Sequence, residues 1–218
     1  MTVKDIARQV RDRDRDRWLA ALYAPVAVRP ALLALWALDL ELGEIVLAAR
    51  DAMVAEIKLA WWRDALIRLD SAPPPGQPLL QALAAEVLPR GVSGALLAEL
   101  EDRWLPVLSA ATTADHAAGG ATLFGLATRL LSPSLAQAER ADALGAAWAA
   151  GDALRRGSGD AAPVFAALPR VSSGLRPLLG LAKLGRRDAR RAAAGQPPEP
   201  RGTLPRQWLL LKAVALGR

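Results

Sequence analysis

Residues 30–49 read PALLALWALDLELGEIVLAA, and this stretch decides the fold class. Pro30 suits the first turn of a helix, because that turn leaves its N–H groups unpaired and proline has none. Apolar side chains then recur around most of the helix, at Leu32, Leu35, Trp36, Leu38, Leu42, Ile45 and Val46. A helix that is apolar nearly all round is buried, so we predict that it lies at the centre of a helical bundle.

Three carboxylates interrupt this apolar helix, those of Asp39, Glu41 and Glu44. An unpaired carboxylate is costly to bury. Glu41 and Glu44 are three residues apart and share a helix face, whereas Asp39 points elsewhere. We expect the two glutamates either to bind a ligand or to form ion pairs inside the bundle, with Arg63, Lys58 or Arg155.

The composition agrees with an all-α fold. Of the 218 residues, 52% are hydrophobic, and seven of the ten aromatic residues are Trp. Helix-forming Ala, Leu and Arg far outnumber the strand-forming Val and Ile. The absence of Cys excludes disulfides and thiol chemistry, and a single His excludes His-rich metal sites. We therefore predict one all-α domain over residues 1–218.

The two ends of the chain differ from its middle. Residues 1–16 are predicted to be a charged, solvated helical arm, because the segment from Arg11 to Arg17 alternates in sign as RDRDRDR. The interleaved arginines would repel a cation, so no metal is expected at Asp12, Asp14 and Asp16. Residues 195–218 are predicted to be a Pro-rich connector and a short C-terminal helix. A cytoplasmic location is expected, since the sequence contains no signal peptide and no long apolar run.

Charge is unevenly distributed along the chain. The formal net charge is +6, but residues 151–218 hold 13 Lys and Arg against 4 Asp and Glu, a net +9. Such an excess indicates either an anionic partner, such as a diphosphate, an anionic membrane surface, a nucleic acid or an acidic protein face, or an ordinary solvated surface. Nucleic acid is not expected, because the sequence has no nucleic-acid-binding motif and its arginines are not interleaved with aromatic residues.

Other helices carry further expectations. A helix capped by Asp51 is predicted to bury one stripe of side chains, Met53, Ile57, Ala60, Trp61 and Ala65. A later helix over residues 134–156 has a middle made of Gly and Ala, which favours either tight helix packing or space for a ligand. His116 is expected near the surface in a structural role.

Four segments resemble the squalene/phytoene synthase family, whose members join two prenyl diphosphates. They are WLAALYAP at residues 18–25, RPALLALWAL at 29–38, DAMVAEIKLAWWRDAL at 51–66 and LGAAWAAGDALRR at 144–156. The resemblance covers residues 17–160 in order. It implies a single-domain helical bundle of the isoprenoid synthase type.

The resemblance also implies two aspartate-rich motifs that hold Mg²⁺ against the diphosphate. At the first motif the matching positions here are Gly43, Glu44 and Leu47, so only one carboxylate remains. The second motif falls on Ala149, Asp152, Arg155, Arg156 and Asp160. A guanidinium at Arg156 opposes Mg²⁺ binding, since each unit-charge repulsion at ~4 Å costs about 4 kcal/mol at an effective dielectric of about 20. Two intact Mg²⁺ clusters are therefore not expected.

A degenerate branch fits these substitutions. LDLELGE at residues 38–44 and EIKLAWWR at 56–63 resemble the phytoene-synthase-like assembly factors of respiratory complex I and their bacterial relatives. That resemblance implies lost synthase activity and a location peripheral to the inner membrane. We expect a protein that binds an isoprenoid-type lipid or a protein partner in respiratory complex assembly. The alternative is an active Mg²⁺-dependent prenyltransferase that condenses prenyl diphosphates in isoprenoid biosynthesis.

The candidate substrate-binding residues that follow are Glu41, Glu44, Arg63, Trp148, Asp152, Arg155 and Asp160. No catalytic residue, metal ligand or cofactor is assigned. Under the alternative, Glu41, Glu44, Asp152 and Asp160 would hold Mg²⁺ and Arg155 would contact the diphosphate. Trp148 lies where the family has a small or aliphatic cavity residue, which predicts a narrower prenyl pocket.

Overall fold

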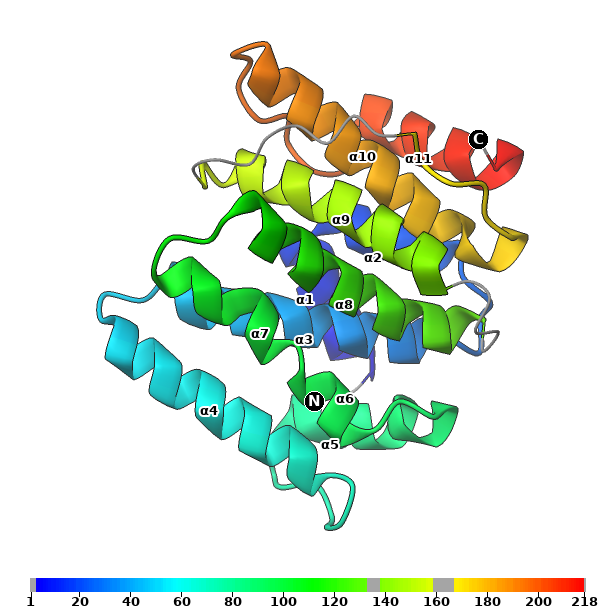
Figure 1. The fold of residues 1–218 in the computed structure, drawn as a ribbon. Helices are drawn as coiled ribbons and strands as arrows, with labels where there is room; N and C mark the ends of the chain where they lie inside the picture. Colours follow the sequence, from blue (N-terminus) through cyan, green and yellow to red (C-terminus); the bar gives the residue numbers. More distant parts are fainter. Residues whose placement is uncertain (1–2, 133–137, 159–166, 218) are drawn as a thin grey trace.

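A computed structural model describes residues 3–132, 138–158 and 167–217, and within these ranges the chain is helical with no β-strand (Figure 1). This confirms the predicted all-α class. The helices are α1 (Val3–Arg13), α2 (Arg15–Leu22), α3 (Arg29–Leu47), α4 (Ala52–Arg68), α5 (Pro78–Glu86), α6 (Gly94–Ala98), α7 (Glu101–Trp104), α8 (Thr113–Leu131), α9 (Ala138–Arg155), α10 (Arg176–Ala193) and α11 (Leu204–Leu216). None of the helices in this described part has the length and apolar character needed to cross a membrane.

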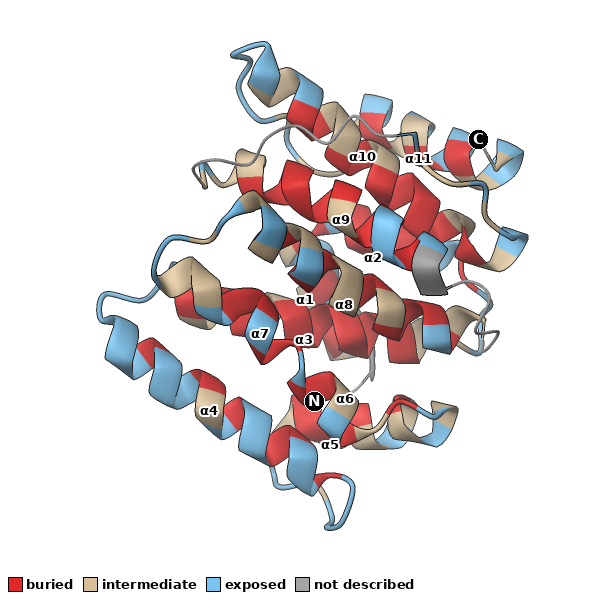
Figure 2. Cartoon of the chain, viewed as in Figure 1, coloured by how far each residue is buried: buried red, intermediate tan, exposed pale blue. Residues whose placement is uncertain are grey.

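Helices α3, α8, α9 and α10 lie side by side in that order, and α11 packs against the outer side of α10 (Figure 1). The short helix α2 contacts α3, α10 and α11, so it bridges the row from behind. Helix α3 is buried along most of its length (Figure 2), which confirms its predicted central position. This arrangement brings α2, an early helix, next to α11, the last one.

Glycines let the helices of this row approach closely. A Cβ on Gly120 of α8 would overlap the backbone of Gly145 on α9, and a Cβ on Gly151 of α9 would lie 2.5 Å from the Cα of Gly185 on α10. Only residues without a side chain permit such contacts between helix backbones. The small residues in the middle of α9 therefore serve tight helix packing at these two crossings.

Helix α4 buries a different face from the one predicted. Asp51 caps it as expected, with its side chain accepting a hydrogen bond from the N–H of Met53. Met53, Ile57 and Trp61 are nevertheless exposed. The buried side chains are those of Ala55, Leu59, Trp62, Ala65 and Leu66. Apolar residues lie on both faces of this helix, so its pattern alone could not decide which face packs inward (Figure 2).

The charged segment at the start of the chain is not a solvated arm. Ile6 and Val10 of α1 are buried in the core, and Asp14, Asp16 and Arg17 are each at most 2% exposed. The helix is interrupted at Asp14, between α1 and α2; Asp14 caps α2 and points its carboxylate inward. Alternating charges predict solvent exposure only if no partners are available inside the fold. Here the partners come from the other end of the chain.

Candidate functional site

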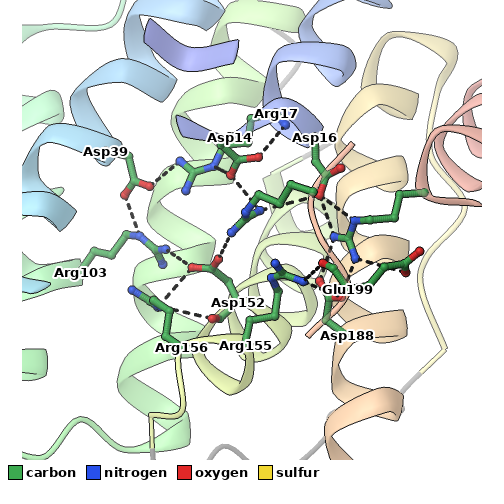
Figure 3. Close-up of polar contacts among 12 residues, drawn as sticks. Asp14, Asp16, Arg17, Asp39, Arg103, Asp152, Arg155, Arg156, Asp188 and Glu199 are labelled. Carbon is green, nitrogen blue, oxygen red and sulfur yellow. Dashed lines mark hydrogen bonds and ion pairs between the residues drawn. The ribbon is translucent and has the colours of Figure 1, made fainter. Parts of the chain in front are cut away.

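Among the described residues, Asp39 of α3 is the most deeply buried acid, with no exposed surface. Its carboxylate accepts hydrogen bonds from Arg17 Nη1 at 2.6 Å and Arg103 Nε at 2.7 Å (Figure 3). It accepts a third from Trp104 Nε1, at 2.9 Å. Burial alone would raise the pKa of Asp39, but the charges of Arg103 and Arg17 outweigh it and hold the pKa below the ordinary 3.8. The Asp39 side chain is therefore an ionised carboxylate held between two guanidinium groups.

Asp152 of α9 is the second buried centre. Its oxygens lie 2.6 Å from Arg201 Nη2, 3.2 Å from Arg156 Nη2 and 3.6 Å from Arg103 Nη2. Burial opposes ionisation here too, but the charges of Arg156 and Arg201 lower the pKa of Asp152 far below its ordinary value. Arg103 contacts both Asp39 and Asp152, so it links the two centres (Figure 3).

The N-terminal acids join the same cluster. Asp14 accepts hydrogen bonds from Arg17 Nε and pairs with Arg201 Nη1, both at 2.8 Å. Asp16 pairs with Arg206 Nη2 at 2.7 Å and accepts a hydrogen bond from the backbone N–H of Gly202. These contacts tie α2 to the connector before α11 and to α11 itself.

The C-terminal helices complete the cluster. Arg206 of α11 is 1% exposed and donates two hydrogen bonds to Asp188 of α10, at 2.6 and 2.9 Å. Arg155 donates to Asp188 at 3.4 Å and to the carbonyl of Glu199 at 2.6 Å. Burial lowers the pKa of Arg206, but its hydrogen bonds to Asp188 and Asp16 outweigh this and raise the pKa above its ordinary value. The group stays charged throughout the accessible pH range.

We call this cluster the central ion-pair network. Its members are six acids and six arginines: Asp14, Asp16, Asp39, Asp152, Asp188, Glu199, Arg17, Arg103, Arg155, Arg156, Arg201 and Arg206. Figure 3 labels all of them except Arg201 and Arg206. Part of the excess positive charge of residues 151–218 therefore forms ion pairs with carboxylates inside the fold and is not presented to a partner. Buried charges persist when they are paired and hydrogen-bonded in this way.

Indole rings lie between the arginines. The Cζ atoms of Arg17 and Arg103 are 4.7 and 4.9 Å from the Trp148 ring centre. Those of Arg103 and Arg156 are each 4.8 Å from the Trp104 ring centre. Phe124 stacks on Trp148 at 5.4 Å between ring centres. Cation–π contacts of this kind add to the attraction when the cation is desolvated. Trp148 is therefore part of a filled core, where the sequence predicted the wall of a prenyl pocket.

The structure divides the candidate residues of the sequence analysis. Asp152 and Arg155 belong to the central ion-pair network. Glu41 and Glu44 lie at the surface of α3, where both pair with Arg13, at 3.3 and 3.2 Å. The partners expected for these glutamates, Arg63, Lys58 and Arg155, were wrong, because Glu41 and Glu44 face α1 across the bundle surface.

One further candidate, Arg63, lies away from the network, and another, Asp160, cannot be placed. Arg63 is 46% exposed and pairs with Asp64 and Glu101, each at 3.3 Å. Gly43, matched to the first aspartate-rich motif, packs under Trp104, and a Cβ there would lie 2.6 Å from the indole Cζ2. Asp160 lies outside the described residues.

Sequence analysis missed most of the network. The sequence places Asp39 in an apolar helix, where an unpaired carboxylate is costly to bury. That cost was the one available signal that an arginine partner existed. Nothing local indicated Arg103, Arg201 or Arg206. His116 was also misplaced: it is 3% exposed, on helix α8, which packs against α7 and α9. A capping box formed by Thr112 and Asp115 fixes that turn.

The donor set of the network does not suit Mg²⁺. A magnesium ion needs several oxygen ligands in octahedral geometry. The oxygens of Asp39 and Asp152 instead face guanidinium nitrogens. Across the ranges that the structure describes, no three His, Cys, Asp or Glu side chains converge as a metal site. The gap lined by Asp16, Trp148 and Asp152 has no room for a water molecule. The residues present here therefore do not fit a magnesium cluster.

Comparison with known proteins agrees with the helical architecture. The chain matches no curated protein closely enough to count as a relative. A family model described as squalene/phytoene synthase matches residues 10–171, about three quarters of the chain.

Proposed function

This chain belongs to the squalene/phytoene synthase family, and we propose that it is a member without synthase activity that acts as a binding protein. The observation that carries the proposal is the pairing of Asp39 and Asp152 with arginines. Prenyl coupling of the family's kind needs metal ions that neutralise the departing diphosphate. In this protein, guanidinium groups stand against the two buried carboxylates, Asp39 on α3 and Asp152 on α9.

Electrostatics supports this proposal. A divalent ion beside Asp152 would lie near Arg103, Arg156 and Arg201, all within 3.6 Å of that carboxylate. Each unit-charge repulsion at ~4 Å costs about 4 kcal/mol at an effective dielectric of about 20, and a divalent ion doubles it. The metal would therefore have to displace one buried arginine, Arg103, and two partly buried ones, Arg156 and Arg201. The alternative, a prenyltransferase that uses Glu41 and Glu44, has no geometric support, because both pair with Arg13 on the surface.

We further propose that the protein binds an isoprenoid-type lipid or a protein partner in respiratory complex assembly. It would do so while attached to an anionic membrane surface. The support for attachment comes from α10 and α11. A groove of about 540 Å³ along α10 is lined mostly by cationic side chains: Lys183, Arg186, Arg187, Arg190 and Arg191. Next to it α11 exposes apolar side chains: Leu204, Trp208, Leu211 and Leu216. Basic residues beside exposed Trp and Leu are typical of helices that bind the bilayer interface.

The experiment that tests the loss of activity is a coupling assay. The purified protein is incubated with farnesyl or geranylgeranyl diphosphate and Mg²⁺, and the organic extract is analysed for coupled product. An active synthase assayed in parallel controls for substrate and metal quality. We expect no product above the protein-free blank. Robust turnover would reject the proposal, and calorimetric titration with Mg²⁺ and a diphosphate analogue would then measure the metal-dependent binding.

A further inference from the structure

Helix α4 carries apolar side chains on the face that points away from the bundle. It lies at one edge of the molecule, and the side that holds Leu59 and Trp62 packs against α6, α3 and α7 (Figure 1). The opposite side is exposed (Figure 2). Its apolar side chains are between 45 and 68% exposed: Met53, Val54, Ile57, Trp61 and Ile67. We call this side the outer face of α4.

The outer face has the properties of a contact surface. Met53, Ile57 and Trp61 follow one another at four-residue intervals, so they form one continuous stripe. Exposed apolar residues on monomers are usually scattered, and contiguous groups of them mark interaction sites. The Trp61 ring is already held in place, because it meets the ring of buried Trp62 edge-on, with 5.4 Å between ring centres. A fixed indole loses little freedom when a partner covers it, and Trp is enriched among the residues that dominate interfaces.

The charges beside the stripe favour another helix over a membrane. Helix α4 holds two acids, Glu56 and Asp64, and three bases, Lys58, Arg63 and Arg68. An anionic bilayer attracts a helix whose polar side is strongly basic, as in the groove on α10. Mixed charges that flank an apolar stripe are instead typical of helices that pair with other helices, where they set the choice and orientation of the partner.

The charge pattern of α4 is complementary to itself. Glu56 and Arg63 are seven residues, or about two turns, apart, so both flank the same edge of the stripe. If a second α4 packs antiparallel about a two-fold axis, Glu56 of each copy lies opposite Arg63 of the other, and both ion pairs form. A parallel pair would set Glu56 against Glu56.

The apolar residues fit the same antiparallel arrangement. The small Ala60 then lies level with Ile57 of the second copy, which leaves room for the larger side chain. At the other edge of the stripe, Trp61 of each copy lies beside Val54 of the other. The ion pairs and the apolar contacts therefore select one register.

We propose that the outer face of α4 is a self-association surface, on which α4 of a second copy of this chain packs antiparallel. The stripe through Met53, Ile57 and Trp61, which the sequence predicts to be buried, is then buried in the dimer. This inference goes beyond the proposed function and does not depend on it. A helix of 17 residues is about 25 Å long, and one such helix from each copy is at the lower end of stable interfaces, which bury about 800 Å² per partner. The expected dissociation constant is on the order of 10 μM.

Sedimentation velocity over about 1–300 μM protein tests the association. We expect a monomer at the lowest concentration and a dimer at the highest. Ile57→Asp should weaken the dimer at least about tenfold, because it places a charge in the centre of the contact. Leu211→Asp, which changes an exposed leucine of α11, is the matched control and should leave the dimer unchanged. A monomer at every concentration, or a dimer that Leu211→Asp abolishes and Ile57→Asp does not, would overturn the proposal.

Disulfide formation tests the register, and it still does so if Ile57→Asp fails to fold. The chain has no Cys, so there is no background reaction. In the antiparallel pair Met53 lies level with Asp64 of the second copy, and both residues are exposed. A mixture of Met53→Cys and Asp64→Cys should form a cross-linked dimer on oxidation. Neither variant should do so alone, because identical residues are then about 16 Å apart along the helix axis and a disulfide spans Cα atoms at most about 7 Å apart. Cross-linking of Met53→Cys with itself would indicate a parallel pair and overturn the proposal.

Vesicle binding separates a second copy from a lipid surface as the occupant of the outer face. At concentrations where the protein is monomeric, Ile57→Asp should co-sediment with phosphatidylserine vesicles as well as the unmodified protein does. Loss of vesicle binding in Ile57→Asp would assign the outer face of α4 to a membrane and overturn the proposal.

Discussion

Replacing Asp39 by Asn should destabilise the protein more than any surface change. The side chain keeps its size but loses its charge, and the amide then presents a donor toward donors. Two charge-assisted hydrogen bonds, from Arg17 at 2.6 Å and Arg103 at 2.7 Å, lose their ionised acceptor. At roughly 1.5–3 kcal/mol each, their loss predicts about 3–6 kcal/mol. Removal of one member of a buried ion pair independently suggests about 3–5 kcal/mol.

That magnitude is a large part of the stability of a typical domain, about 5–15 kcal/mol. Urea unfolding followed by Trp fluorescence measures it directly. With a denaturant slope of about 3 kcal/mol/M, a loss of about 4 kcal/mol lowers the unfolding midpoint by about 1.3 M. The slope itself should stay unchanged, which also tests whether unfolding is two-state.

The matched control is Glu41→Gln on the same helix. Glu41 pairs with Arg13 at 3.3 Å where both side chains are partly exposed. Surface pairs of this kind contribute less than about 1 kcal/mol, so the midpoint should barely move. If Asp39→Asn cost no more than Glu41→Gln, the central ion-pair network would not be what holds α2, α3 and α7 together, and the electrostatic reasoning would fail.

Three other outcomes follow from the same structure. Asp39 and Asp152 have pKa values below 3.8 in the folded protein, so the stability that they contribute is complete above that pH and is lost as the pH falls toward their folded-state values. Tm should therefore drop steeply below about pH 4, and less steeply in the Asp152→Asn variant. Gly151→Ala should lower the free energy of unfolding by about 1–3 kcal/mol, because the added Cβ meets the backbone of α10. Gly125→Ala, with open space at its Cβ, should raise it by about 0.4–1 kcal/mol. Equal effects of the two substitutions in chemical unfolding would contradict the close contact between α9 and α10. Trp148→Ala should cost about 3–5 kcal/mol and, if the indole narrows a lipid pocket, should improve displacement of a fluorescent isoprenoid-type lipid; unchanged displacement would separate Trp148 from lipid binding.

Helix positions followed from the sequence more reliably than helix orientations. The central place of α3 was predictable because apolar residues surround nearly its whole circumference, so any rotation about its axis buries it. Helix α4 has apolar residues on two faces, and the predicted stripe through Met53, Ile57 and Trp61 proved to be exposed. Helices α6 and α7 pack against the face of α4 that carries Leu59 and Trp62, and this contact determines which face is buried.

The candidate site was harder to predict than the fold. Asp152 and Arg155 were identified, but Asp16 and Arg206 are 190 residues apart in sequence and were assigned to a solvated arm and a connector helix. A charge alternating along a segment looks the same whether its partner is water or a distant arginine. The difference lies in desolvation, which depends on what else occupies the same volume.

The sequence by itself determined that this chain is helical and that its central helix is buried. Those properties are set by local propensity, by apolar periodicity and by residue identity. Tertiary structure alone decided that Asp39 and Asp152 are neutralised by arginines from α2, α7 and the residues after α9. Pairing between charges far apart in the chain depends on distance in space, and no local pattern encodes that distance.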